Sequence, residues 1–148
     1  MVQFSRRLAM CFCILGVFIQ ASAPFAEDAT KSSRIVLSGY DPVSYFTEGK
    51  PVKGLAELSA PYDNGTYWFK NADHRAMFVA NPDRYAPQFG GLCAIDLSHG
   101  IKTEPDPEAW TIADGKLYVF SDKRGPSFFA EQGPSIVEAA AKNWSTSK

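Results

Sequence analysis

The chain of 148 residues lacks the motifs that most enzyme classes need. It has no strand-to-helix elbow with a nucleophilic serine, no glycine-rich loop that could cradle phosphate, no Cys-x-x-Cys and no His-Glu-x-x-His. It has only two histidines and three cysteines. No pairing of a nucleophile with a base is evident, so we expect a protein that is not an enzyme.

Long hydrophobic runs are also missing, apart from one near the N-terminus. Leu8 to Ile19 is almost entirely apolar, but a helix needs roughly 20 such residues to cross a bilayer. Arg6 and Arg7 precede the run and small residues follow it, which is the three-part pattern of a secretory signal peptide. We predict a signal peptide over residues 1–26, cleaved near Ala26, and a periplasmic or secreted protein. An uncleaved N-terminal membrane anchor is the alternative.

Cleavage removes basic charge and two cysteines. The signal segment holds two of the 15 basic residues and none of the 16 acidic ones, so the remaining 13 basic and 16 acidic residues give a net charge of −3. No basic patch is left to neutralise phosphates, which argues against a nucleic-acid partner. The remaining chain has no transmembrane segment, so we expect no stable membrane insertion. Cys93 is its one cysteine, which excludes an internal disulfide.

Turn and cap signals predict one small α+β domain. Residues 27–36 read as a flexible leader and residues 37–148 as the domain. Asp63-Asn64-Gly65 and Asp114-Gly115 each separate two strand-like runs and predict two β-hairpins in a short antiparallel sheet. The hairpins are packed by several short helices, expected at residues 72–80 after an Asn71 cap, at 92–97, and in a tail over 127–144 that forms one helix or two helices split at Gly133-Pro134. Asp41 and Pro42 predict a further helical turn that buries Val43 and Phe46.

Cys93 is the residue most able to carry chemistry. We expect it in the first turn of a helix that follows Gly90-Gly91, where unpaired N–H groups stabilise a thiolate. Three interpretations stay open for this thiol. It is a small buried hydrophobic residue, a metal ligand, or a redox-active group.

Two histidines and one internal methionine complete the candidate metal ligands. His74 and Met77 are three residues apart on a predicted helix, which places them within reach of each other. His99 is six residues from Cys93, and on a continuous helix their side chains point about 120° apart. A histidine in the last helical turn that interacts with exposed carbonyls is therefore the simpler interpretation of His99.

Tyr67-x-Phe69, His74-Arg75-x-x-Phe78 and Asn81-Pro82-x-x-Tyr85 follow one another along the chain, and together they resemble the signature of YHS domains. A second group of motifs resembles the exported bacterial branch of that family: Ala86-Pro87-Gln88-Phe89-Gly90-Gly91-x-Cys93-Ala94, Gly39-Tyr40-Asp41-Pro42-Val43, Asp106-Pro107-Glu108-Ala109-Trp110-Thr111-Ile112 and Asp114-Gly115-Lys116-Leu117-Tyr118. The similarity runs from about Leu37 to Trp144.

The resemblance implies three metal-ligand positions, which metal-binding YHS and related domains fill with cysteine. Here these positions are Ser44, Lys70 and His74. Ser and Lys are poor ligands for a soft ion, so a complete tetrahedral zinc site of the usual kind cannot form there. Any remaining site would use Cys93 with His74, completed by Met77 or His99, a set that suits copper(I) better than a hard cation.

Three hypotheses for function therefore stand. The first is a non-enzymatic exported YHS-like protein that binds or senses a transition metal, copper or else zinc, through Cys93 and His74. The second is a module in which Cys93 is structural and a cleft lined by Tyr67, Trp68, Phe89 and Trp110 takes a small ligand or a protein partner. The third is a thiol-active protein that uses Cys93.

Overall fold

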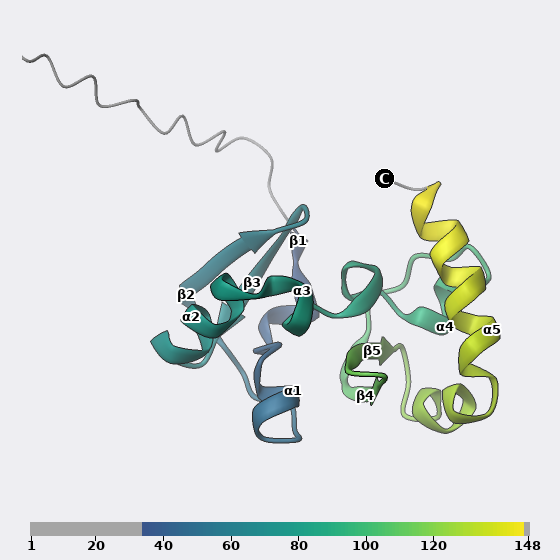
Figure 1. The fold of residues 1–148 in the computed structure, drawn as a ribbon, viewed down its shortest axis with the longest axis horizontal. Coiled ribbons are helices and arrows are strands. Elements are labelled where there is room, and N and C mark those ends of the chain that lie inside the picture. Colours follow the sequence, from purple (N-terminus) through teal and green to yellow (C-terminus); the bar gives the residue numbers. More distant parts are fainter. Residues whose placement is uncertain (1–33, 147–148) are drawn as a thin grey trace, which may run out of the picture. The chain divides into compact units, whose positions relative to one another are not determined.

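A computed structural model describes residues 34–146 (Figure 1). The predicted signal peptide, its cleavage site and most of the predicted leader lie outside these residues. The elements in chain order are β1 (Arg34–Ile35), η1 (Val36–Gly39), α1 (Ser44–Thr47), β2 (Leu55–Tyr62), β3 (Gly65–Phe69), α2 (Ala72–Ala80), α3 (Pro82–Tyr85), η2 (Gln88–Gly91), α4 (Ala94–Ser98), β4 (Asp106–Ala113), β5 (Lys116–Phe120) and α5 (Gly125–Ser145).

The predicted α+β class and both hairpins are confirmed. β2 pairs antiparallel with β3, and β4 pairs antiparallel with β5, but the two hairpins form separate sheets. β1 extends the first sheet by pairing parallel with β3. This pairing and the burial of Val36 make residues 34–36, at the end of the predicted leader, part of the fold.

The hairpin turns follow from their sequences. Asp63 and Asn64 both have positive φ, and so do Asp114 and Gly115, as the two-residue turns of tight hairpins require. The first turn is therefore Asp63-Asn64, one residue earlier than an Asn-Gly turn. Gly65 instead opens β3, where a Cβ atom would lie 2.4 Å from the Val36 side chain.

The helices agree with their cap signals. α2 spans the predicted residues, and the Asn71 side chain accepts the His74 backbone N–H as predicted. α4 confirms the helix predicted at residues 92–97, although it begins at Ala94 and ends at Ser98. The tail forms one helix, α5, with Pro134 inside it, which is the single-helix alternative and not the division at Gly133-Pro134.

Two segments depart from the predicted boundaries. Asp41 does not cap α1 itself, because its side chain accepts the Val43 backbone N–H in the turn just before that helix. Val43 is buried as predicted, whereas Phe46 is only partly buried. β4 begins at Asp106, although the prolines at 105 and 107 predict a loop there, and its pairing with β5 is irregular between Asp106 and Trp110.

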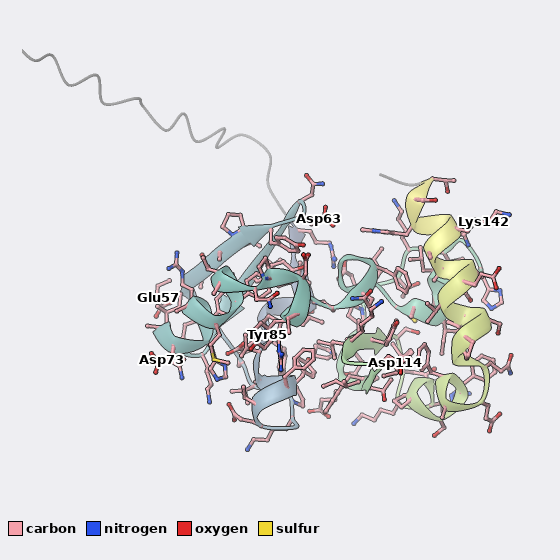
Figure 2. All side chains as sticks on the ribbon, in the orientation of Figure 1. Glu57, Asp63, Asp73, Tyr85, Asp114 and Lys142 are labelled. Atoms are coloured by element: carbon pink, nitrogen blue, oxygen red, sulfur yellow. The ribbon has the colours of Figure 1, made fainter. Side chains whose placement is uncertain are left out.

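β5 joins the two parts of the hydrophobic core. Leu117 and Val119 belong to a first cluster with Tyr67, Phe69 and Phe78. Tyr118 and Phe120, on the opposite face of the strand, belong to a second cluster with Cys93, Phe129 and Ile136. Figure 2 draws the described side chains on the same ribbon. No helix between residues 34 and 146 is both long and apolar enough to cross a membrane.

Replacing Gly39 with alanine should lower the free energy of unfolding by about 2–3 kcal/mol, through a positive φ and a steric clash. Gly39 has φ +79°, and a Cβ atom there would lie 2.5 Å from a ring carbon of Trp68. Gly49 has φ +64° with open space around it, so Gly49→Ala isolates the backbone cost of about 1 kcal/mol. Urea denaturation of both variants measures the difference. Equal losses would mean that Trp68 yields to the new methyl group without cost.

Candidate functional site

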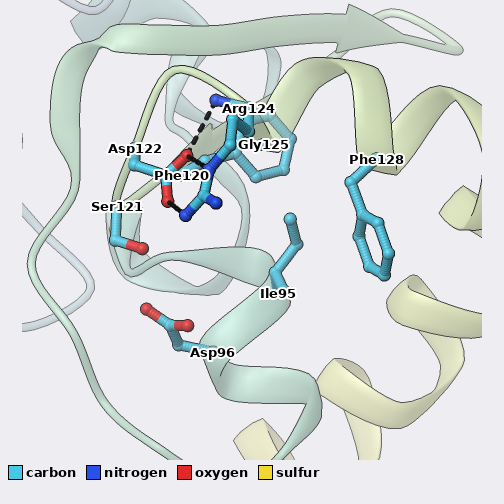
Figure 3. Close-up of a pocket in the computed structure, with 8 residues that line it drawn as sticks. All are labelled: Ile95, Asp96, Phe120, Ser121, Asp122, Arg124, Gly125 and Phe128. Atoms are coloured by element: carbon cyan, nitrogen blue, oxygen red, sulfur yellow. Dashed lines mark hydrogen bonds and ion pairs between the residues drawn. The ribbon is translucent and has the colours of Figure 1, made fainter.

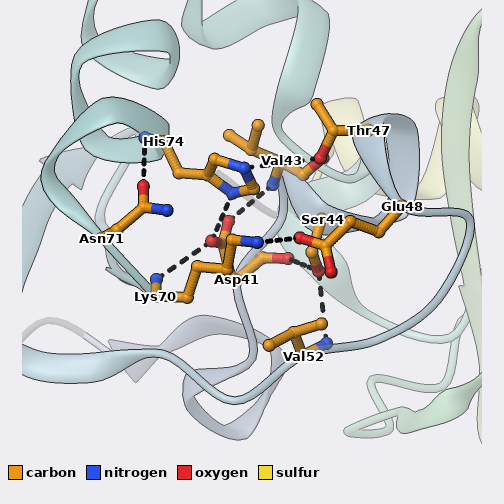
Figure 4. A network of polar contacts seen from close by, with 9 residues as sticks. All are labelled: Asp41, Val43, Ser44, Thr47, Glu48, Val52, Lys70, Asn71 and His74. Carbon is orange, nitrogen blue, oxygen red and sulfur yellow. Dashed lines mark hydrogen bonds and ion pairs between the residues drawn. The ribbon is translucent and has the colours of Figure 1, made fainter.

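The three positions that the resemblance implies as metal ligands all contact one buried residue, Asp41. Asp41 is 0% exposed, and its Oδ2 lies 2.7 Å from His74 Nδ1 and 3.0 Å from the Lys70 backbone N, which donates to it. The Ser44 hydroxyl donates to the Asp41 carbonyl oxygen at 2.7 Å. Figure 4 shows the three residues arranged around Asp41.

Local signals in the sequence bring these residues together. The Asp41 Oδ1 accepts the Val43 N–H at 2.8 Å, which fixes the turn that presents Ser44. The Asn71 cap starts α2 directly after β3, so Lys70 and His74 lie on either side of the cap. The polar contacts of Asp41 thus tie the turn before α1, the end of β3 and the first turn of α2 to one another.

The surrounding polar groups are already engaged within the protein. Ser44 Oγ also accepts the Val52 N–H, and the Lys70 ammonium pairs with Glu48. The hydrogen bond from Lys70 keeps the pKa of the Glu48 carboxyl below its ordinary value. Since the donor set is a serine, a lysine and one histidine, these positions do not fit a soft metal ion.

His74 has one ring nitrogen that the Asp41 carboxylate does not engage. Because Nδ1 faces the Asp41 carboxylate, the opposite nitrogen is directed away from it, toward the Thr47 hydroxyl at 3.4 Å. A carboxylate often orients a metal-binding or catalytic imidazole in this way. Among the described residues, however, no group of three or more His, Cys, Asp or Glu side chains is placed to hold a metal ion.

Cys93 lies in the second cluster, on the other side of β5. It is the N-cap of α4, just before the first turn in which we expected it, and only 1% of it is exposed. Its Sγ accepts the Asp96 N–H at 3.4 Å and lies 3.5 Å from Ser121 Oγ. Backbone pairing with Val119 fixes the residue against β5. Its surroundings are those of a buried thiol with two polar neighbours.

The structure does not bring the four predicted metal ligands together. Met77 is half-buried against the first cluster, and His99 is exposed at the C-cap of α4. α2, which carries His74 and Met77, is well separated from α4 (Figure 1). Phe78 of α2 packs in the first cluster and Cys93 in the second, so β5 stands between them. The spacing along the chain could not reveal this separation.

The predicted aromatic cleft is only partly assembled. Tyr67 and Phe89 both line a small cavity of about 170 Å³. Trp110 instead packs edge-on against Tyr45, with ring centroids 5.1 Å apart, and Trp68 covers Gly39. The four aromatic residues therefore serve different packing contacts and do not form one ligand cleft.

A larger cavity, of about 310 Å³, lies beside Cys93 between α4 and the start of α5 (Figure 3). It includes both polar neighbours of the thiol, Asp96 and Ser121. Its lining residues are Ile95, Asp96, Phe120, Ser121, Asp122, Arg124, Gly125 and Phe128. Sequence reasoning missed this site because Ser121 is 28 residues from Cys93 and no motif links the two.

An ion pair forms one edge of this cavity. The Arg124 guanidinium donates to both oxygens of Asp122, from Nε at 3.2 Å and from an Nη at 2.9 Å. The Arg124 hydrogen bond holds the pKa of the Asp122 carboxyl below its ordinary value, and the same contact raises the pKa of Arg124. The two charges therefore neutralise each other.

A second cavity, of about 550 Å³, lies between the β4–β5 hairpin and α5. Tyr118, Phe129 and Val137 give it a largely apolar wall, and Asp114 and Lys116 at the hairpin turn supply charge. It contains none of the residues that the sequence singled out as chemically active.

Comparisons with protein-family models, with curated proteins and with solved structures found no match to this chain.

Proposed function

We propose that this chain is an exported binding protein, without catalytic activity, that holds a small organic ligand in the cavity beside Cys93. The observation that carries the proposal is the position of that cavity. Its polar residues Asp96 and Ser121 are the two polar neighbours of the buried Cys93 thiol, so these two residues would lie between a ligand in the cavity and the cysteine.

The composition of the cavity supports a small ligand. Binding sites for small molecules are mostly apolar with a few polar groups that fix orientation, and they typically measure about 300–1,000 Å³. The cavity beside Cys93, at about 310 Å³, falls at the lower end of that range. Ile95, Phe120 and Phe128 provide the apolar surface, and Asp96 and Ser121 the polar groups.

Nuclear magnetic resonance titration of the purified exported protein tests this proposal. The probes are benzylamine, benzyl alcohol and phenylacetate, which share a phenyl ring and differ in charge. We expect saturable shifts of the backbone amides of Asp96, Ser121 and Phe128 with at least one probe. Shifts centred on Tyr118 and Val137 would place the ligand in the other cavity, and no saturable shift with any probe would reject the proposal.

Transition-metal binding through Cys93 and His74 stays a separate hypothesis. The orientation of His74 by Asp41 favours it, and the separation of His74 from Cys93 argues against one ion shared by both. The test is competition for copper(I) between the purified protein and a chelator, repeated with Cys93→Ser and His74→Ala. Unchanged affinity in both variants would reject these two ligands.

A further inference from the structure

The cavity beside Cys93 contains one carboxylate that no other group neutralises. Asp96 is half-buried, and among residues 34–146 its carboxylate makes no hydrogen bond or ion pair. Figure 3 shows it directed toward Ser121. Arg124, which could have served as its partner, is held by both oxygens of Asp122. The cavity therefore carries one net negative charge.

The other lining residues of this cavity include apolar side chains that can contact the apolar part of a ligand. Phe120 is fully buried and Phe128 is 39% exposed, so Phe120 forms the inner wall of the cavity and Phe128 its outer edge. Ile95 precedes Asp96 on α4 and adds an aliphatic surface next to the carboxylate. A ligand complementary to this lining has a positive group at one end and an apolar group at the other.

From the charge and the walls we propose that the ligand is a small organic cation, an amine with an aromatic or aliphatic body. This inference rests on the proposed function. The ammonium group pairs with the Asp96 carboxylate and donates a second hydrogen bond to the Ser121 hydroxyl oxygen. An ammonium needs only one counter-ion and a few acceptors, whereas a metal ion needs several ligands that these side chains do not supply.

Asp96 also has a purely structural role that the test must separate from binding. It is the third residue of α4, where a carboxylate interacts favourably with the positive end of the helix. Asp96→Asn keeps the size of the side chain and removes its charge, and Asp96→Glu keeps the charge. Glu57→Gln, on an exposed position of β2 that lines neither cavity, is the matched control for losing one negative charge elsewhere.

The experiment compares the three phenyl probes by calorimetric titration of the exported protein and these variants. We expect benzylamine to bind about tenfold more tightly than benzyl alcohol, and phenylacetate most weakly. Asp96→Asn should remove the preference for the amine, Asp96→Glu should restore part of it, and Glu57→Gln should leave it unchanged.

The outcomes separate this inference from the proposed function. Equal binding of the three probes at the Asp96 and Ser121 amides would overturn the cationic ligand and leave the binding function intact. A preference for benzylamine that persists in Asp96→Asn would also overturn it, because the charge would then lie elsewhere. No binding of any probe would overturn both.

Discussion

Replacing Asp41 with asparagine should lower the free energy of unfolding by about 3–5 kcal/mol, the cost of breaking a buried charged network. The carboxylate accepts three donors, the backbone N–H groups of Val43 and Lys70 and the Nδ1 of His74. An asparagine side chain keeps one oxygen and places an NH₂ group where the other was. At least one buried donor then faces another donor, and each unsatisfied buried group costs about 1–3 kcal/mol.

Urea denaturation followed by tryptophan fluorescence measures this loss. Glu48→Gln is the matched control. It removes another carboxylate of the same network, but the Glu48 carboxylate is partly exposed and pairs with Lys70. We expect its effect to be much smaller, since solvent screens such a pair. If Asp41→Asn were as mild as Glu48→Gln, Asp41 would not hold the turn, β3 and α2 together as described.

Local signals explain which parts of the fold could be predicted. The Asn71 cap and the turn residues of the two hairpins act within a few residues, and α2 and both hairpins lie where those signals place them. The parallel pairing of β1 with β3 depends on residues about 30 positions apart, such as Arg34 and Gly65, and has no local signal. The position of β5 could not be predicted either. Both of its faces are apolar in the sequence, but nothing local shows that each face packs in a different cluster.

The candidate site could be predicted only where the resemblance supplied the correspondence. The resemblance implies Ser44, Lys70 and His74 as one set of positions, and in the structure all three contact Asp41, Ser44 at the backbone carbonyl and the other two at the carboxylate. The central role of Asp41 was missed, because in the sequence it reads only as a cap. The pairing of Cys93 with His74 relied on ligand chemistry alone, which carries no information about the strand that stands between them.

Phe120→Ala should destabilise the protein by about 3–5 kcal/mol, as for other buried phenylalanines. Phe120 is 0% exposed, and its ring packs against Phe129 with centroids 5.4 Å apart. The chain enters α5 directly against it, since a Cβ atom at Gly125 would lie 2.3 Å from the Phe120 Cβ. No neighbour can move into the space without shifting this helix, so the cavity left by the ring stays open.

Phe128→Ala is the control that separates stability from binding, because Phe128 borders the same cavity but is 39% exposed. Truncating it should cost about 1 kcal/mol, since only part of its apolar surface leaves water on folding. It should nevertheless weaken benzylamine binding, because the ligand loses one apolar wall. Urea denaturation and calorimetric titration of both variants give the two readouts. If Phe128→Ala bound benzylamine as tightly as the unmodified protein, the ligand would not occupy the cavity beside Cys93.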